Sequence, residues 1–293
     1  MSGHIAIATC TQLLPDGDVE DATLLRALAE LDLKATLVGW SEPDVDWAGF
    51  DATVIRSTWD YTTRRAEFLA WTDRVPRLFN PAPVVAANSD KRYLAGLAAA
   101  GLPVVRTTFF EPDQPVRLPV TGEYVLKPSI GAGSGGAGRF DAGQPADAQR
   151  ASAHAAALQA AGRTVLLQPY LAGVDTAGET ALMFFNGRYS HAICKSAMLA
   201  AGSQYGLGMD QLYVGEVITA REPSAAELEL AGAVLAELTA GLPEPLLYAR
   251  IDLLPAEHGP VLVEAELTEP SLFLDHDEQA ARRLAEAISD RIG

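Results

Sequence analysis

The N-terminal part of the chain alternates between short apolar segments and longer amphipathic ones. Residues 4–10, 35–40 and 52–57 are short and apolar, which is typical of strands, whereas residues 18–31 and 64–75 carry apolar side chains at helical spacing. Strands that alternate with helices pair in parallel, because each helix returns the chain to the same end of the sheet and packs on its face. We therefore expect an α/β lobe built on a parallel sheet.

The pattern changes after residue 87. A helix is expected to start at Asn88 or Ser89 and to run to Ala100, where Gly101 stops it. Further along, Asn186-Gly187 between two apolar segments is a strong signal for a two-residue hairpin turn. The other expected elements are strands at 104–110, 124–128, 165–170, 181–185, 189–195, 247–254 and 261–267, helices at 146–161, 224–240 and 277–292, and a mobile glycine-rich loop at 200–215.

Charge and composition limit the partners. The formal net charge of −16 argues against a nucleic acid, which needs a basic surface, and against an anionic membrane surface. We find no apolar run long enough to span a bilayer and no signal-peptide pattern at the start of the sequence. Cys10 and Cys194, the only cysteines, lie in apolar runs and indicate buried thiols in a reducing cytoplasm. We expect a small-molecule partner, and the sequence is also compatible with a homo-oligomer.

A glycine-rich loop follows the strand predicted at 124–128. Gly131-Ala-Gly-Ser-Gly-Gly136 matches the G-x-G-x-x-G pattern of dinucleotide sites, but the next residues, Gly138-Arg-Phe-Asp141, return as a strand and do not enter a helix. The loop is therefore predicted to be a hairpin tip whose backbone N–H groups close over phosphates. Lys127, in the apolar strand before the loop, needs an anionic partner. An edge-strand lysine beside an ordinary flexible loop is the alternative.

Carboxylates are concentrated on two predicted strands near the C-terminus. Glu264 and Glu266 alternate along one strand and point to the same face, and a neighbouring strand would bring Asp252 alongside. Like charges on one face repel one another unless a cation neutralises them. Three hard oxygen ligands without histidine or thiolate suit Mg²⁺ or Mn²⁺. A solvated strand face is the alternative.

A strand lysine, a glycine-rich hairpin and a distal carboxylate trio, in this order, resemble the ATP-grasp superfamily over nearly the whole chain. The resemblance implies three lobes: an N-terminal parallel-sheet lobe at 1–87, a small central α+β lobe at 88–170 and a C-terminal antiparallel-sheet α+β lobe at 171–293. Four segments resemble, more narrowly, the cycloserine-forming O-ureido-serine cyclo-ligases and their relatives. These segments are Arg56-Ser-Thr-Trp-Asp-Tyr61, Asn88-Ser-Asp-Lys91, Gln168-Pro-Tyr170 and Glu264-Ala-Glu-Leu-Thr-Glu-Pro-Ser271.

The resemblance also assigns a nucleotide and metal site. The ATP-binding residues that it implies are Lys91, Lys127, Gly133, Ser134, Gly135, Gly136, Gln168, Tyr170, Asp175 and Lys195. Among them, Lys127 corresponds to the lysine at the α- and β-phosphates, Lys195 to a cation at the terminal phosphates and Asp175 to the residue that binds the ribose. Asp252 and Glu264 match the metal-binding carboxylates, and Glu266 stands where asparagine is usual. ATP and Mg²⁺, or Mn²⁺ in its place, are the implied cofactors.

Substrate recognition is expected on the N-terminal lobe and near the last strand. The candidate substrate residues are Arg56, Thr58, Asp60, Tyr61, Glu269 and Ser271. Arg56 stands at the end of a predicted parallel strand, where open α/β sheets bind ligands, and its guanidinium can hold a carboxylate through two parallel hydrogen bonds. Thr58, Asp60 and Tyr61 either hold an amine or hydroxyl of the substrate or belong to a capped turn around a buried tryptophan, Trp59. Glu269 and Ser271 either meet an ammonium group or cap the next segment.

The implied reaction is ATP-dependent activation of a small amino acid's carboxylate as an acyl phosphate, followed by ring closure. With O-ureido-D-serine as substrate, the product would be D-cycloserine. Lys127, Lys195 and Arg56 are the expected catalytic residues, because phosphoryl transfer depends on positioning and on neutralising charge. Three other functions stay open at this point: a ligase that joins a carboxylate to a separate amine, a non-catalytic nucleotide-binding module, and a nicotinamide-dependent oxidoreductase.

Overall fold

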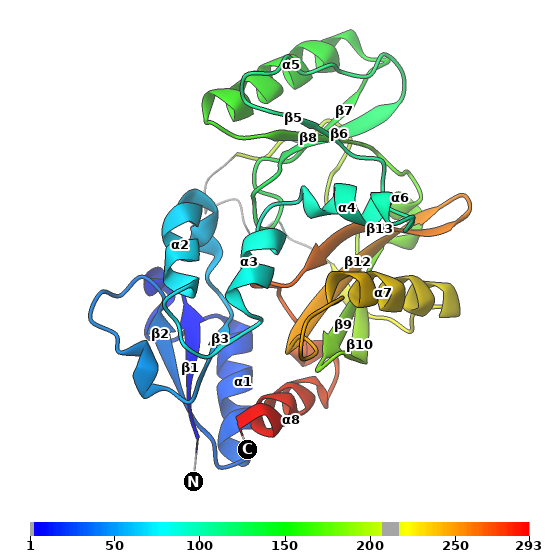
Figure 1. Cartoon of the computed structure of the whole chain (residues 1–293). Coiled ribbons are helices and arrows are strands. Elements are labelled where there is room, and N and C mark those ends of the chain that lie inside the picture. The colour runs from blue at the N-terminus through cyan, green and yellow to red at the C-terminus, as the bar shows by residue number, and fades with distance from the viewer. Residues whose placement is uncertain (1–2, 207–216, 293) are drawn as a thin grey trace.

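The chain forms three sheets in a computed structural model that describes residues 3–206 and 217–292. Figure 1 shows the N-terminal sheet at the lower left, a central lobe at the top and the C-terminal sheet at the right. No helix within the described residues is long and apolar enough to cross a membrane. Both cysteines are free; Cys10 is buried as predicted, whereas Cys194 is only partly buried. The predicted mobile loop at 200–215 falls largely outside the described residues.

The N-terminal lobe is built on a parallel sheet in the order β2-β1-β3-β4, as the alternating sequence pattern predicts. Its central strand β1 is apolar because the strand is covered on both faces, so that Ile5 and Ile7 are fully buried. The elements of this lobe are β1 (His4–Thr9), α1 (Val19–Glu30), β2 (Lys34–Gly39), β3 (Ala52–Ile55), the 3-10 helix η3 (Trp59–Thr63), α2 (Arg65–Thr72) and β4 (Leu78–Phe79).

The central lobe is an antiparallel sheet in the order β5-β8-β6-β7, with one face covered by α5. As predicted, the glycine-rich loop is a hairpin tip, because β6 and β7 pair directly, with Leu126 opposite Gly138. Small side chains on α5, such as Ala151 and Ala155, let the helix lie close to Phe140. The elements are β5 (Thr108–Phe110), β6 (Glu123–Pro128), β7 (Gly138–Asp141), α5 (Pro145–Ala160) and β8 (Val165–Pro169).

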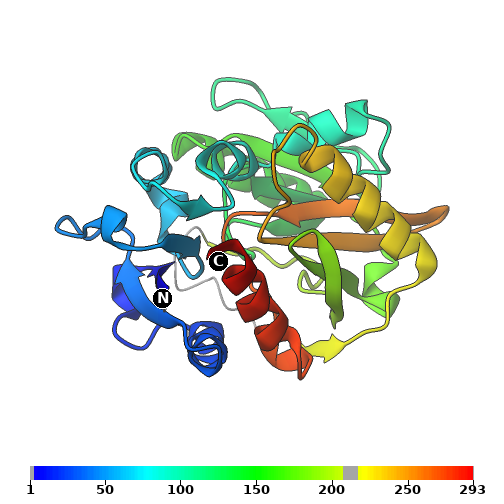
Figure 2. The ribbon, with the colours of Figure 1, turned by 60° about the horizontal axis from the view of Figure 1, so that its bottom comes forward.

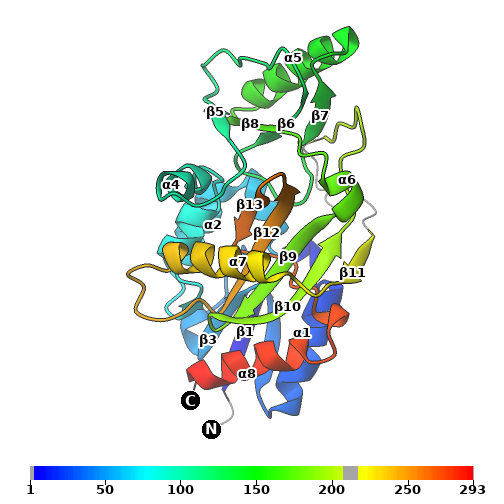
Figure 3. The ribbon, with the colours of Figure 1, turned by 90° about the vertical axis from the view of Figure 1, so that its right-hand side faces the viewer.

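The C-terminal lobe is an antiparallel sheet in the order β11-β10-β9-β12-β13, and Figure 3 shows α7 lying across it. The predicted Asn186-Gly187 turn joins β9 and β10, with both residues in the left-handed region at φ 48° and 72°. The elements are α6 (Val174–Ala177), β9 (Glu179–Phe185), β10 (Arg188–Lys195), β11 (Ile218–Ala220), α7 (Ala225–Leu238), β12 (Tyr248–Ala256), β13 (Gly259–Glu266) and α8 (Ala280–Ile292).

Two segments between the lobes differ from the prediction. The helix expected to start at Asn88 or Ser89 begins only at Tyr93 (α4, Tyr93–Ala99), and a separate helix, α3 (Ala82–Asn88), ends at Asn88. The Asn88 side chain bonds to the backbone of Ala265 and Leu267 and does not cap a helix. The strand expected at 104–110 is divided. Its first part bridges β13 through Val104 and Leu262, whereas β5 pairs with β8 in the central sheet.

The two ends of the chain share one hydrophobic core. Helix α8 lies beside α1 in Figure 2, and Leu284 and Ile288 of α8 belong to the same buried cluster as Leu24 and Leu28 of α1. The same cluster includes Met183 and other residues of β9. The N-terminal lobe and the C-terminal sheet are therefore joined by apolar packing over a common core.

A buried asparagine also ties these two lobes together. Asn80, directly after β4, adopts φ 59° and is fully buried. Its amide nitrogen donates to the carbonyl oxygens of Tyr248 at 2.8 Å and Leu267 at 2.7 Å, and its oxygen accepts from the backbone nitrogen of Leu247 at 2.9 Å. A short amide side chain thus satisfies three backbone groups at the ends of two strands.

We predict that Asn80→Ala destabilises the protein by about 3 kcal/mol, because it leaves buried backbone donors and acceptors unsatisfied. Chemical denaturation followed by circular dichroism measures this free energy of unfolding. The exposed amide variant Gln12→Ala is the control and should change stability little. A loss below about 0.5 kcal/mol for Asn80→Ala would contradict the assigned role.

Candidate functional site

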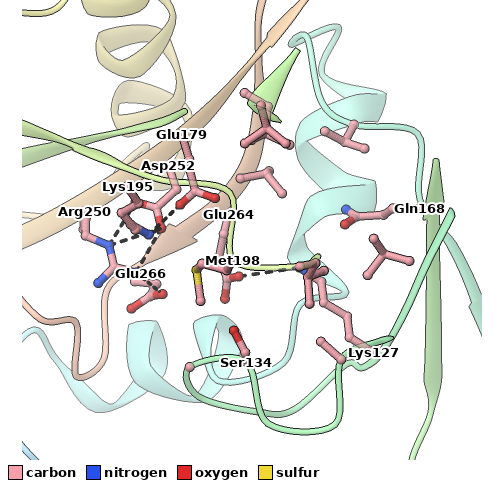
Figure 4. Close-up of a pocket in the computed structure, with 18 of the residues that line it drawn as sticks. Lys127, Ser134, Gln168, Glu179, Lys195, Met198, Arg250, Asp252, Glu264 and Glu266 are labelled. Atoms are coloured by element: carbon pink, nitrogen blue, oxygen red, sulfur yellow. Dashed lines mark hydrogen bonds and ion pairs between the residues drawn. The ribbon is translucent and has the colours of Figure 1, made fainter. Parts of the chain in front are cut away.

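A cavity of about 500 Å³ lies between the central and C-terminal sheets. Figure 4 shows the side chains that converge on it. The central lobe contributes Lys127, Gln168 and the loop residues Gly133 and Ser134. The C-terminal sheet contributes charged side chains from four strands, namely Glu179, Lys195, Arg250, Asp252, Glu264 and Glu266. The structure thus brings together the lysines, the glycine-rich loop and the carboxylates that the sequence singled out.

The alternation of β12 explains why charges gather on one face of the C-terminal sheet. Ile251 and Leu253 point into the apolar core beneath α7, so Arg250 and Asp252 point to the opposite face. Asp252 lies opposite Glu264 on β13, and the register shifts immediately after this pair. The cavity occupies the part of this charged face that α8 and the N-terminal lobe leave uncovered.

Asp252 is held between two cations. Its carboxylate accepts hydrogen bonds from Lys195 Nζ at 2.9 Å and from Arg250 Nε at 2.9 Å. Burial acts to raise the pKa of Asp252, but Arg250 and Lys195 outweigh it and lower the pKa to about 2. Lys195 also bonds to Glu179 at 2.5 Å, and Arg250 bonds to Glu266. These groups therefore form one continuous chain of buried ion pairs.

Glu264 pairs with two lysines that come from outside the C-terminal sheet. Lys91 Nζ lies 2.8 Å from its carboxylate and Lys127 Nζ lies 3.7 Å from it. The same Lys91 nitrogen donates to the carbonyl oxygen of Gly131 at 2.8 Å, at the base of the glycine-rich loop. Burial lowers the pKa of Lys127 despite the neighbouring carboxylate. Lys127 thus has an anionic partner, as an apolar strand requires, and it faces the cavity.

The three predicted metal ligands line the cavity, but each faces a basic side chain. Within the described residues, no three histidine, cysteine, aspartate or glutamate side chains converge closely enough to hold a metal ion. The donor set still suits a hard divalent cation, since Asp252, Glu264 and Glu266 offer only carboxylate oxygens on adjacent strands of one cavity wall. Lysine and arginine side chains already neutralise these carboxylates, as expected for a cavity wall whose carboxylates require positively charged partners.

Two carboxyl groups of the cavity wall, those of Glu266 and Glu269, have pKa values raised to about 7 and about 8. Burial raises the pKa of Glu266 to about 7, and the nearby Glu264 and Asp252 add to the effect. Burial, together with the charge of Glu266, raises the pKa of Glu269 to about 8, although the hydroxyl of Tyr61 donates a hydrogen bond to it. Glu269 is therefore largely protonated at neutral pH, which is the reverse of an exposed glutamate.

Residues 168–170, at the end of β8, form the other end of the cavity, and we call this segment the hinge. Gln168, Pro169 and Tyr170 line it, and the Gln168 amide donates to Thr107 Oγ1 at 2.9 Å. Asp175 does not line the cavity. Its carboxylate accepts from the Tyr170 hydroxyl at 2.5 Å and from Arg139 at 3.3 Å. The predicted ribose ligand is thus next to the cavity, where other residues hold it.

The glycine-rich loop depends on its glycines. Gly133 and Gly136 adopt φ 56° and 74°, a region that other residues rarely reach. Gly133 and Ser134 line the cavity, as does Ala137 at the end of the loop, whereas Gly135 and Gly136 do not line it. The loop therefore faces the cavity on both sides of the Gly135-Gly136 pair.

Three of the predicted substrate residues lie behind the cavity wall. Arg56 is 3% exposed and bonds to Glu20 at 2.9 Å, and its other guanidinium nitrogens have no partner among the described residues. Thr58 is fully buried. Asp60 is buried and accepts from the indole nitrogen of Trp40 at 2.7 Å.

Other residues of the same region do reach the cavity. Glu269 and Ser271 line it as predicted, and Tyr61 approaches it through its hydrogen bond to Glu269. Trp59, which the turn alternative placed in the interior, lines the cavity as well. Arg56 acts on this wall indirectly, because its partner Glu20 accepts from the backbone nitrogen of Leu272 at 2.8 Å.

The sequence analysis missed two charged residues of the wall. Arg250 stands two residues before Asp252, and strand periodicity alone places both on one face. Glu179 opens β9, opposite Lys195 on β10. This pairing depends on a register shift between Tyr189 and His191, because the unbroken register of the Asn186-Gly187 hairpin would place Cys194 opposite Glu179. The signal for Arg250 was therefore present in the spacing, whereas the pairing of Glu179 depends on an irregularity that the hairpin signal does not predict.

Known proteins are similar to the whole chain. The family described as D-cycloserine synthetase DcsG, N-terminal domain, matches residues 5–80. The cycloserine biosynthesis protein DcsG of Streptomyces lavendulae is 39% identical over 305 aligned residues, which cover 99% of this chain and 99% of that protein. The similarity to this protein therefore extends through all three sheets.

Solved structures share the fold over the whole chain. The crystal structure of D-cycloserine synthetase DcsG has a TM-score of 0.86 at 38% identity and covers 99% of this chain and 100% of its own. A D-alanine–D-alanine ligase from Bacillus anthracis, solved with ATP, has a TM-score of 0.69 at 13% identity and covers 100% of this chain and 97% of its own. The predicted three-lobe fold is confirmed.

We predict that Glu269→Gln stabilises the protein without ATP and metal, increasingly so as the pH rises. The pKa of Glu269 is raised from 4.5 to about 8, so the stability that its bound proton provides is complete below pH 4.5 and is lost as the pH rises to 8. The glutamine variant keeps a neutral group throughout. Its advantage in free energy of unfolding should grow by about 1 kcal/mol per pH unit between about pH 5 and 8.

Urea denaturation at several pH values tests this prediction. Glu257→Gln is the matched control, because Glu257 lies in the exposed turn between β12 and β13. Its difference from the unmodified protein should stay constant over the same range. An equally constant difference for Glu269→Gln would contradict the buried, protonated state of this carboxyl group.

Proposed function

The chain belongs to the D-cycloserine synthetase family of ATP-grasp ligases, and we propose that it closes O-ureido-D-serine to D-cycloserine at the expense of ATP. The observation that carries the proposal is identity of 39% over the whole chain. The cavity supports it, since cations for phosphates and carboxylates for a metal face each other there. We place the reaction in the cytoplasm, where ATP is supplied and the two free cysteines stay reduced.

ATP would lie between the central and C-terminal sheets. Its adenine would meet the hinge at Gln168 and Tyr170, and its phosphates would lie under the loop at Gly133–Gly136. Lys127 and Lys195 reach the cavity from opposite sheets and would neutralise the phosphate oxygens. Lys91 supports the loop through the Gly131 carbonyl. The phosphates of bound ATP would thus replace carboxylates as the partners of Lys127 and Lys195.

Asp252, Glu264 and Glu266 would hold Mg²⁺, or Mn²⁺ in its place. Divalent metal supplies charge neutralisation at the β- and γ-phosphates when it is bound. Lysine and arginine now pair with these three carboxylates, so a metal would release those cations towards the phosphates and the substrate. The carboxylates and the basic residues of the wall therefore exchange partners when ATP and metal enter.

The amino acid would bind where Arg250 meets the segment after β13. Arg250 can orient the substrate carboxylate, and its Nη1 already donates to the Ser271 carbonyl at 3.1 Å. Glu269, held by Tyr61, faces the same space, and an ammonium group bound beside it would favour the ionised carboxylate and pair with it. Arg56 supports this segment from behind through Glu20. Arg56 is thus a positioning residue in this proposal.

The reaction would proceed in three stages. A carboxylate oxygen attacks the γ-phosphorus, which forms the acyl phosphate and releases ADP. The nitrogen bonded to oxygen in the ureido group then attacks the activated carbonyl carbon, phosphate leaves, and a five-membered ring closes. Hydrolysis removes the carbamoyl group as carbon dioxide and ammonia. The glycine-rich loop would keep water from the acyl phosphate until the ring has closed.

ADP release with ATP, Mg²⁺ and O-ureido-D-serine as sole co-substrate tests the proposal. Formation of D-cycloserine in step with ADP would support it. No release with this compound, but release with another amino acid and an added amine, would overturn the cyclisation in favour of joining two molecules. No release with any acid, while ATP still binds, would favour a nucleotide-binding module.

We predict that Lys127→Ala weakens ATP binding by about tenfold, because one charge-assisted contact to the phosphates is lost. Isothermal titration with a non-hydrolysable ATP analogue and Mg²⁺ measures the dissociation constant. Lys34→Ala, on the exposed edge strand β2, is the control and should bind normally. Unchanged affinity of the Lys127 variant would remove its phosphate role.

We predict that Glu264→Gln lowers turnover by at least about 100-fold, because the amide gives up the negative charge that a metal ion requires. Turnover should recover in part when the Mg²⁺ concentration is raised. Circular dichroism shows whether the variant is folded. Near-normal turnover at low Mg²⁺ would contradict the metal assignment.

A further inference from the structure

The imidazole of His154 joins the two segments that cover the cavity. His154 lies on α5 in the central lobe and is 4% exposed. Its Nε2 is 2.9 Å from the carbonyl oxygen of Gly136, and its Nδ1 is 2.9 Å from the side-chain amide of Gln204. A carbonyl oxygen can only accept, so Nε2 carries the proton and Nδ1 accepts from the amide. Burial lowers the pKa of His154, which agrees with a neutral ring.

The segment around Gln204 comes from the C-terminal lobe but is fastened to the central lobe. Its backbone pairs with the glycine-rich hairpin, with Gly136 N 2.9 Å from Gly206 O, Tyr205 N 2.9 Å from Ala137 O and Arg139 N 3.0 Å from Ser203 O. His154 supplies the side-chain bonds at the same place. One buried residue therefore contacts both the loop and the segment that lies against it.

The position of these bonds connects them to the cavity. Gly136, whose carbonyl oxygen His154 holds, stands two residues after the cavity-lining Ser134 and directly before Ala137, which also lines the cavity. Met198 and Leu199 line the cavity on the other segment, shortly before Gln204. His154 itself does not reach the cavity. A shift of the Gly136 carbonyl would therefore displace cavity-lining groups without touching any of them directly.

We infer that His154 is a positioning residue for the phosphate-covering loop, which it holds closed over ATP by donating to Gly136 and accepting from Gln204. The inference rests on the proposed function for the role of the loop. The loop would both bind phosphate and exclude water, so loss of His154 should weaken ATP binding and should also let water hydrolyse the acyl phosphate before the ring closes. A residue that only fills the core would affect stability and neither of these two quantities.

Two variants of the full-length protein separate these possibilities. His154→Leu removes both hydrogen bonds, whereas His154→Gln keeps one donor and one acceptor on a flexible side chain. We expect His154→Leu to raise the dissociation constant of the non-hydrolysable ATP analogue about tenfold, the effect of one buried hydrogen bond. It should also lower the ratio of D-cycloserine formed to ADP released. His154→Gln should stay within about twofold of the unmodified protein.

The outcomes are distinct. Unchanged ATP affinity and product ratio in a folded His154→Leu variant would overturn the inference, as would a glutamine variant that behaves like leucine. If the leucine variant does not fold, Gln204→Met tests the same connection, because it removes only the bond to Nδ1. The binding measurement needs no amino-acid substrate, so it stays informative even if the proposed cyclisation is wrong.

Discussion

The balance of charge on the buried face of the C-terminal sheet is the condition on which the arrangement of the lobes depends. Four basic and five acidic side chains meet there: Lys91, Lys127, Lys195 and Arg250, and Glu179, Asp252, Glu264, Glu266 and Glu269. A buried charge without a partner is far more costly than a buried pair, so removal of an ionised member leaves its partners less well compensated, whereas the protonated Glu269 can be replaced by a neutral group. The opposite face of the sheet can be covered by the apolar helix α7, whereas this face requires polar partners from another lobe.

Much of this could be predicted from the sequence, because the periodicity of single elements is local. Alternation identified the strands of the N-terminal sheet, and Asn186-Gly187 identified a hairpin, although the register of that hairpin shifts between Tyr189 and His191. The helix break at Asn88 could not be predicted, since its cause is a pair of hydrogen bonds to backbone groups on β13. The divided strand at 104–110 has the same kind of cause in the bridge from Val104 to Leu262.

In the site, too, the sequence predicts local features, whereas contacts between distant segments appear only in the structure. Lys127, Asp252 and Glu264 were identified because charged residues within apolar strands are conspicuous in a sequence. Arg56 is equally conspicuous, yet its side chain bonds to Glu20, which in turn accepts from the backbone nitrogen of Leu272. Only the packing of α1 against the segment after β13 determines these contacts. A charged residue in an apolar strand therefore identifies an electrostatic need, whereas its partner is determined by the tertiary fold.

The common core of α1 and α8 bears on how the protein acquires its structure during translation. Leu24 and Leu28 leave the ribosome about 250 residues before Leu284 and Ile288, against which they pack. Until then the N-terminal lobe exposes an apolar surface that nothing covers, and a nascent chain in this condition is prone to aggregation. The core of the N-terminal lobe is therefore complete only after α8, a helix far downstream of α1 in the sequence, has been synthesised.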